Sequence, residues 1–210
     1  CSSEQVTVTH SFMRTHDDTL NVKGLTDLGY PGGEKKGTWS PAGVRKPARN
    51  IRFERCVVWN DRAHALMIGP ETRTTEISGV LYKDLDIIHA LSVDAIGIYS
   101  GDAAEIHDIR YEGLRIEDPR VMTLINLRAH PTYVTADATQ GTIRGVVFKD
   151  LEITSPTPVY SAICADKAEI GPVTFDHVRF NGQLAHTVEE LRLHTRNQVG
   201  QVTILPPPPK

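Results

Sequence analysis

The residues of this 210-residue chain best suited to acid–base chemistry are two adjacent carboxylates, Asp17 and Asp18, and the histidine His64. Cleavage of a glycosidic bond needs one carboxyl group that is protonated and a second that is ionised. Two neighbouring carboxylates repel each other, which raises the pKa of one of them and would supply the acid. Adjacent aspartates also suit a simple turn, and His64 a polar strand end, so these residues alone leave both interpretations open.

One short apolar pattern recurs along almost the whole chain and predicts how these residues come together. An apolar residue is followed by an aromatic residue two positions later and then by two more apolar residues. The copies are Val6-x-Val8-x-x-Ser11-x-Met13 in degenerate form, Ile51-x-Phe53-x-x-Cys56-x-Val58, Val80-x-Tyr82-x-x-Leu85-x-Ile87, Ile109-x-Tyr111-x-x-Leu114-x-Ile116, Val146-x-Phe148-x-x-Leu151-x-Ile153 and Val173-x-Phe175-x-x-Val178-x-Phe180. Successive copies are 27 to 45 residues apart, a spacing that indicates stacked supersecondary units.

Within each unit, apolar and polar residues alternate with a period of two, which is typical of strands and not of helices. After each copy comes a polar bend and another short apolar strand, at 20–22, 66–68, 96–98, 123–127 and 162–164. Three short strands per repeat predict an all-β fold, a right-handed parallel β-helix of about six coils, each about 4.8 Å above the last. A leucine-rich α/β solenoid is excluded because no helical stretch separates the strands.

We expect a single domain over residues 1–205, with a loop insertion at 24–49 and a proline-rich tail at 206–210. A smaller loop is expected at 129–141. Long loops in a compact solenoid tend to carry function, whereas a run of prolines cannot pair in a sheet.

Alignment of the repeated third strands places Asp18, His64 and Asp94 in one column, each two residues before a buried apolar position. Equivalent positions in neighbouring coils lie one strand spacing apart, so the three side chains should be close. The outward positions that follow are mostly small, which predicts the floor of a binding groove. The expected substrate-binding residues on this face are Asn21, Lys23, Asp94, Tyr99 and Arg128.

Composition excludes several classes of partner. The net charge of −3, with no basic stripe, argues against nucleic acid. No apolar run reaches eighteen residues, so we expect no membrane span. The three cysteines are widely spaced and odd in number, which predicts neither a metal site nor a disulfide framework, and Cys56 occupies a core position of the repeat. We expect no cofactor and no metal, because a calcium site would need more oxygen ligands than the Asp pair provides.

Two segments resemble the polygalacturonase-type glycoside hydrolases. Residues 16–23, His-Asp-Asp-Thr-Leu-Asn-Val-Lys, are similar to their Q-D-D-C-x-x-[IV]-[KN] motif, and residues 63–69, Ala-His-Ala-Leu-Met-Ile-Gly, are similar to G-H-G-x-S-I-G. Residues 14–18 and 57–60 also resemble the dextranase and isopullulanase relatives. The resemblance implies the pectin lyase-like β-helix, with the acid and the water-activating base on Asp17 and Asp18 and with His64 orienting them. It also implies a secreted or periplasmic protein that degrades a polysaccharide.

Two departures from this family bear on the substrate. The cationic R-I-K segment of the family falls on Gly97-Ile98-Tyr99, so a galacturonate would lose its charge-assisted partners and a neutral sugar near Tyr99 is expected. The family's third carboxylate, from N-T-D-G, would fall upstream of residue 1. An uncapped first coil would also expose apolar interior and unpaired backbone groups. We therefore expect missing N-terminal coils, or a partner chain, to cover it.

The sequence thus predicts a glycoside hydrolase that cleaves a polysaccharide or oligosaccharide by inversion, as the C-terminal portion of a longer enzyme. Carbohydrate is the expected partner. The alternative is a non-catalytic structural or carbohydrate-binding β-helix fragment. A lyase or epimerase is the third choice, because those enzymes share the fold but usually present basic residues in the groove.

Overall fold

The chain is all-β. The computed structural model describes residues 2–24, 46–70, 72, 74–130 and 141–205. Within these ranges 68% of residues lie in strands and none in a helix. The strands form one 17-stranded sheet in which every pairing is parallel except that of β14 with β15. The predicted Pro-rich tail and residues 25–45 of the predicted loop insertion lie outside the described residues.

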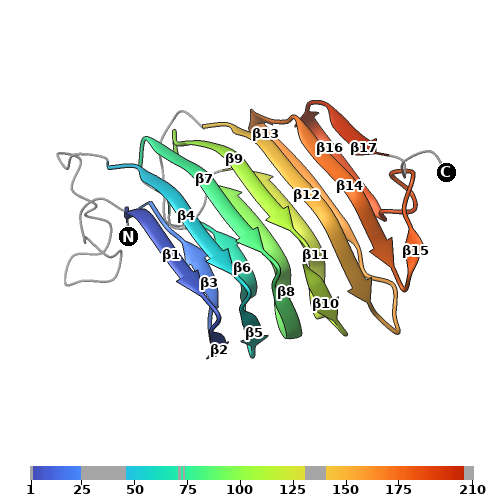
Figure 1. Cartoon of the computed structure of the whole chain (residues 1–210). Helices are drawn as coiled ribbons and strands as arrows, with labels where there is room; N and C mark the ends of the chain where they lie inside the picture. The colour runs from blue at the N-terminus through green and yellow to red at the C-terminus, as the bar shows by residue number, and fades with distance from the viewer. Residues whose placement is uncertain (1, 25–45, 71, 73, 131–140, 206–210) are drawn as a thin grey trace.

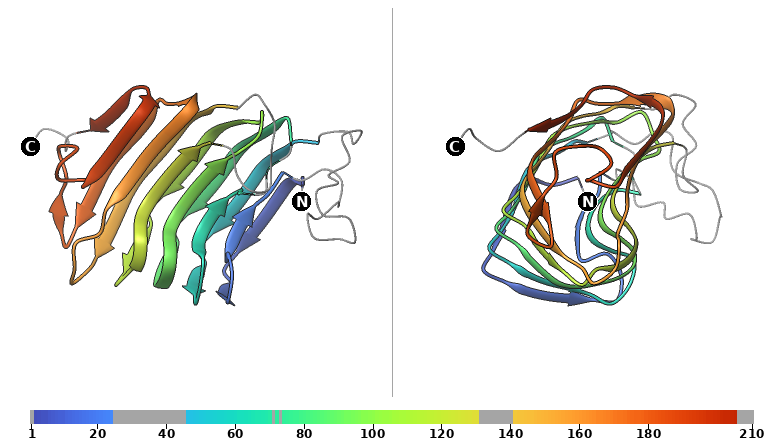
Figure 2. Two further views of the ribbon diagram at one scale, coloured as in Figure 1. Left: turned by 180° about the vertical axis from the view of Figure 1, so that it is seen from behind. Right: turned by 90° about the vertical axis from the view of Figure 1, so that its right-hand side faces the viewer.

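The strands pair in three ladders; the strands of the first lie side by side in Figure 1, and the end view of Figure 2 shows the chain running around a common interior. The first ladder contains β1 (Glu4–Thr9), β4 (Ala48–Glu54), β7 (Glu76–Lys83), β9 (Glu105–Glu112), β12 (Ile143–Thr154), β14 (Val173–Phe180) and β17 (Val202–Leu205). The second contains β2 (Phe12–Thr15), β5 (Val57–Asn60), β8 (Asp86–Ser100), β10 (Arg115–Glu117) and again β12 and β14. The third contains β3 (Leu20–Val22), β6 (His64–Ile68), β8, β11 (Arg120–Ala129), β13 (Ser161–Ile170) and β16 (Leu193–Val199). The short strand β15 (Gln183–Leu184) folds back on β14.

The repeated aromatic position of the sequence forms a continuous stack in the core. Register pairs these residues in successive strands of the first ladder, and their ring centroids lie 4.9 to 5.1 Å apart, close to the strand spacing. The rings are those of Phe53, Tyr82, Tyr111, Phe148 and Phe175. The apolar positions around them are also buried, including Cys56 at 1% exposure. The predicted alignment of the repeats is therefore confirmed.

The polar turns between the first and second ladders share one backbone conformation. Arg55, Asp84, Gly113, Asp150 and His177 all have positive φ, between 51° and 64°. Glycine has a further reason at position 113, where a Cβ would lie 2.7 Å from a carboxylate oxygen of Asp84 in the preceding turn. These residues set the corner that each strand must turn.

The bounds of β4 and β8 are among those that differ from the sequence prediction. Strand β4 begins at Ala48, inside the expected loop 24–49, because Ala48 is buried and pairs with Ile77. Strand β8 runs unbroken through 15 residues, where two short strands were expected. This strand contributes to both the second and the third ladder, and Ser92, between the two parts, has a positive φ of 101°.

Candidate functional site

The predicted column lies where the chain enters the third ladder. Leu20 pairs with Leu66, and the amide of Thr19 donates to the carbonyl of His64, so Asp18 is beside His64. His64 in turn pairs with Asp94 of β8. Three residues separated by up to 76 positions in the sequence thus become neighbours across successive strands.

His64 lies between the two carboxylates. Its Nδ1 is 2.6 Å from Asp18 Oδ1, and its Nε2 is 3.4 Å from Asp94 Oδ2. The second contact is within ion-pair distance, although it is not aligned as a hydrogen bond. The side chains of His64 and Asp18 are 10% and 12% exposed, and that of Asp94 is fully buried. Of the two carboxylates that contact His64, Asp18 is therefore partly accessible to solvent and Asp94 is not.

The surroundings favour the protonated form of His64. Burial alone lowers the pKa of an imidazole, but the contacts and negative charges of Asp18 and Asp94 outweigh it and raise the His64 pKa to about 9. An imidazolium at neutral pH then separates two carboxylates that would otherwise repel each other. Charge balance is the condition under which such buried acids are tolerated.

Asp94 is held from its other side by residues of its own strand and of the neighbouring strand β11. The Tyr99 hydroxyl donates to Asp94 Oδ2 at 2.5 Å, and Asn126 Nδ2 lies 3.0 Å from Asp94 Oδ1. Arg128 donates from Nε to Asn126 Oδ1 at 3.0 Å and lies over the Tyr99 ring, 5.1 Å from its centroid. Tyr99 and Arg128, both predicted from sequence, therefore belong to the same network.

Sequence reasoning missed Asn126, which is fully buried at the centre of this arrangement. One signal was present: Asn126 is the polar residue between the apolar Ile125 and Leu127, and it pairs in register with Gly97 on the predicted face. A buried amide needs partners on the same face.

Asp18 has its own polar partners at the other end of the network. Asn21 Nδ2 lies 2.5 Å from Asp18 Oδ2, and Lys23 Nζ lies 3.8 Å from the same oxygen. Both residues follow Asp18 on or beside β3, as the alternation of a strand predicts. All five residues proposed to bind substrate thus lie in the network around His64.

Asp17, in contrast, points out of this network. It is exposed, and its Oδ1 accepts the amide of Asp18 at 2.8 Å, which is a local turn contact. Its carbonyl accepts a hydrogen bond from Asn60 Nδ2 at 2.9 Å, and Asn60 also contacts the Thr19 hydroxyl and the Arg62 carbonyl. Asn60, fully buried and not predicted, therefore positions the Asp17–Asp18 turn. A catalytic role for Asp17 stays a prediction.

The predicted groove floor is corrected by the structure. Ala65, Met67 and Ala95 have no exposed surface, so they do not line an open groove. Met67 fills the space over Gly97, where an added Cβ would lie 2.6 Å from the Met67 sulfur. Glycine at position 97 makes room for the Met67 thioether. The arginine that the R-I-K segment of the polygalacturonase-type enzymes has at this position would not fit beside it.

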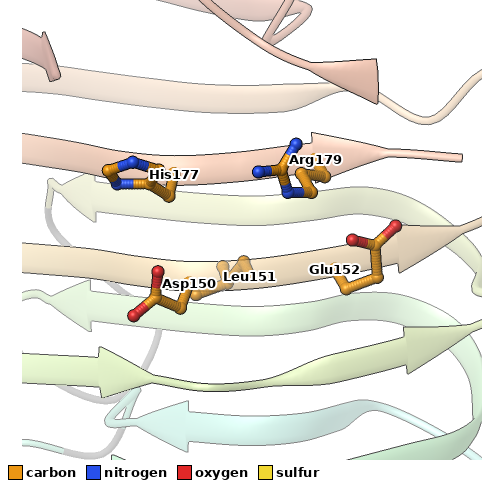
Figure 3. A pocket seen from close by; sticks show the side chains of 5 residues that line it. All are labelled: Asp150, Leu151, Glu152, His177 and Arg179. Carbon is orange, nitrogen blue, oxygen red and sulfur yellow. The ribbon is translucent and has the colours of Figure 1, made fainter. Parts of the chain in front are cut away.

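A separate hollow of about 210 Å³ lies on β12 and β14, shown in Figure 3. It is lined by Asp150, Leu151, Glu152, His177 and Arg179, and none of these belongs to the column. Among the described residues no three His, Cys, Asp or Glu side chains are grouped to hold a metal ion.

Comparisons of the chain with models of protein families, with curated protein sequences and with solved structures find no match. The described part of the chain contains no helix long and apolar enough to cross a membrane.

Proposed function

We propose that the protein is a right-handed parallel β-helix of the pectin lyase-like kind that hydrolyses glycosidic bonds of a polysaccharide or oligosaccharide. The parallel ladders, the three-strand repeat and the axial stack of aromatic rings support the coiled arrangement. The observation that carries the activity is the His64 imidazole held between the Asp18 and Asp94 carboxylates.

In this proposal Asp18 accepts a proton from the attacking water, because it is the solvent-accessible carboxylate of the pair that contacts His64. The imidazolium of His64 and the amide of Asn21 fix the orientation of that carboxylate. Asp17, exposed and adjacent in the chain, supplies the proton to the leaving oxygen. Asp94 holds His64 in place, and Tyr99 with Arg128 contact a sugar beside it. The product would form by inversion, and the resemblance to secreted polysaccharide-degrading enzymes supports an extracytoplasmic location.

A second candidate function is a non-catalytic carbohydrate-binding β-helix. The full burial of Asp94 and Asn126 favours it, because two buried polar side chains that hydrogen-bond to each other also serve as a structural brace. In that case Asp18 would matter for stability but not for turnover.

The experiment is a screen for new reducing ends on dextran, pullulan and polygalacturonate with the wild-type chain and Asp18→Asn. We expect Asp18→Asn to lower the rate about 10²- to 10⁴-fold, the usual contribution of acid–base assistance. Asp108→Asn is the matched control, because the Asp108 side chain is 73% exposed and lies outside the network. Circular dichroism of each variant separates lost activity from lost folding. Equal turnover in the folded Asp18→Asn and Asp108→Asn variants would show that Asp18 is not the base.

A further inference from the structure

The face of the third ladder that carries the column continues over β11, β13 and β16, where Asn126 is fully buried, Ala162 is half-buried and His194 is exposed. Asn126 pairs with Ala162, and Ala162 with His194, so the three lie in one row across successive strands. His194 is therefore about 10 Å from Asn126 along this row, two strand spacings away. The row connects the candidate site to the C-terminal end of the described chain.

An exposed aromatic pair lies at the end of this row. Tyr160 precedes β13, with 51% of its surface exposed, and its ring centroid is 5.9 Å from that of His194, at an interplanar angle of 32°. The Tyr160 carbonyl accepts a hydrogen bond from the amide of Leu124 at 2.7 Å, which fixes the backbone of Tyr160 to the preceding strand of the ladder, β11. Tyr160 is thus an anchored ring that presents an open surface.

The surface beside these two rings consists of small side chains with polar groups at its edge. Ala162 and Cys164 follow Tyr160 at alternate positions and are half-buried, so small side chains lie between the rings and the next row. Arg128 and Arg196 flank Cys164 in register, from the strands on either side. Two planar rings beside small residues, with guanidinium donors at the edge, suit a sugar ring, which offers an apolar C–H face and a rim of hydroxyls.

We propose that Tyr160 and His194 form a stacking subsite for a sugar unit of the glycan, so that the chain of sugars extends from the column along the axis toward β16. This inference rests on the proposed function for the direction of the glycan. The rings bind the C–H face of the sugar, and Arg128 with Arg196 donate hydrogen bonds to its hydroxyls. An isolated exposed tyrosine is common in proteins, whereas this ring lies beside a second ring, a low floor and a row that leads to Asp94.

The test is affinity electrophoresis of the whole chain in the cold, through gels that contain dextran, pullulan or polygalacturonate. For a polymer that retards the wild-type protein, we expect Tyr160→Ala to raise the dissociation constant about 3- to 10-fold, the usual range for a lost aromatic contact. Tyr160→Phe keeps the ring and should bind like the wild type. Phe12→Ala is the matched control, because Phe12 is 60% exposed on β2, in the second ladder.

The inference is overturned if Tyr160→Ala binds unchanged, if Phe12→Ala weakens binding equally, or if none of the three polymers retards the chain. Retardation by polygalacturonate alone that disappears in salt would show charge attraction instead of stacking, which also overturns it. The outcome is distinct from that of the hydrolase proposal. Retardation that depends on Tyr160, without cleavage of any polymer, would refute the hydrolase proposal and support the subsite. Cleavage that depends on Asp18, with no effect of Tyr160→Ala on binding, would support the hydrolase proposal and refute the subsite.

Discussion

The His64 network predicts that part of the stability of the fold depends on pH in the mildly alkaline range. The His64 pKa is raised from 6.5 to about 9 in the folded state. A group with a raised folded-state pKa stabilises the fold fully below its unfolded pKa, and this stabilisation is lost as the pH rises through the folded value. The window for His64 is therefore pH 6.5 to 9.

The size of the effect follows from the shift. A pKa difference of about 2.5 units corresponds to about 3 kcal/mol of unfolding free energy at acidic pH. Linkage leaves about 2 kcal/mol at about pH 7.5 and less than about 0.5 kcal/mol at about pH 9. Because the side chain is only 10% exposed, solvent screening reduces this contribution little.

The assay is urea unfolding of the wild type and of His64→Asn, from about pH 6 to about pH 10, so that other titrating groups cancel in the difference. We expect the stability gap between the two proteins to narrow steadily as the pH rises through 9. His16→Asn, at an exposed position outside the network, is the control for the loss of a histidine side chain. A gap that stays constant between pH 6.5 and 9 would refute the assignment of an imidazolium between two carboxylates.

Three further changes test the network and the fold by the same unfolding measurement. Asp94→Asn removes a fully buried charge that faces His64 and should cost about 3 kcal/mol or more at neutral pH, and a loss below about 1 kcal/mol would contradict the buried pair. Gly113→Ala should destabilise the fold more than Gly182→Ala. Both glycines have positive φ, but the new Cβ at 113 would approach the Asp84 carboxylate, whereas nothing lies within 4 Å of a Cβ at 182. Tyr111→Phe should leave the unfolding free energy unchanged or raise it, because the buried Tyr111 hydroxyl has no hydrogen-bond partner. Tyr82→Phe removes a hydroxyl that contacts two backbone carbonyls and should cost about 1 kcal/mol. A larger loss for Tyr111→Phe than for Tyr82→Phe would contradict this packing.

The arrangement of the core could be predicted from the sequence because it repeats. Each copy has its aromatic residue at the same position of the apolar pattern, so the pattern alone aligned Phe53 with Tyr82 and Tyr111. The column followed from the same alignment, since Asp18 and His64 precede the same apolar pair in their strands. In a repeat fold, residues at equivalent positions of successive copies pair with each other, so the repeat in the sequence also predicts the long-range strand pairing.

The orientation of individual side chains could not be obtained in this way. Asp17 and Asp18 are adjacent and chemically alike, yet the turn that Asn60 anchors directs one carboxylate outward and the other toward His64. The filling of the face over Gly97 by Met67 depends on a rotamer, which the strand register does not determine. Asn126 lies on β11 opposite Gly97, and its contact with Asp94, three residues earlier on β8, depends on the direction of the Asn126 side chain, which the register does not determine.

The central claim, that water cleaves a glycosidic bond at the Asp18–His64 pair, is tested most directly by product analysis in oxygen-18 water. Each polymer that the wild type degrades is digested, and the new ends are read by mass spectrometry, with Asp18→Asn run in parallel. We predict a single heavy oxygen at each new reducing end from the wild-type protein and no such product from Asp18→Asn. Products that lack the heavy oxygen and carry an unsaturated sugar would show elimination instead, and labelled products at equal rates from a folded Asp18→Asn would place the chemistry elsewhere.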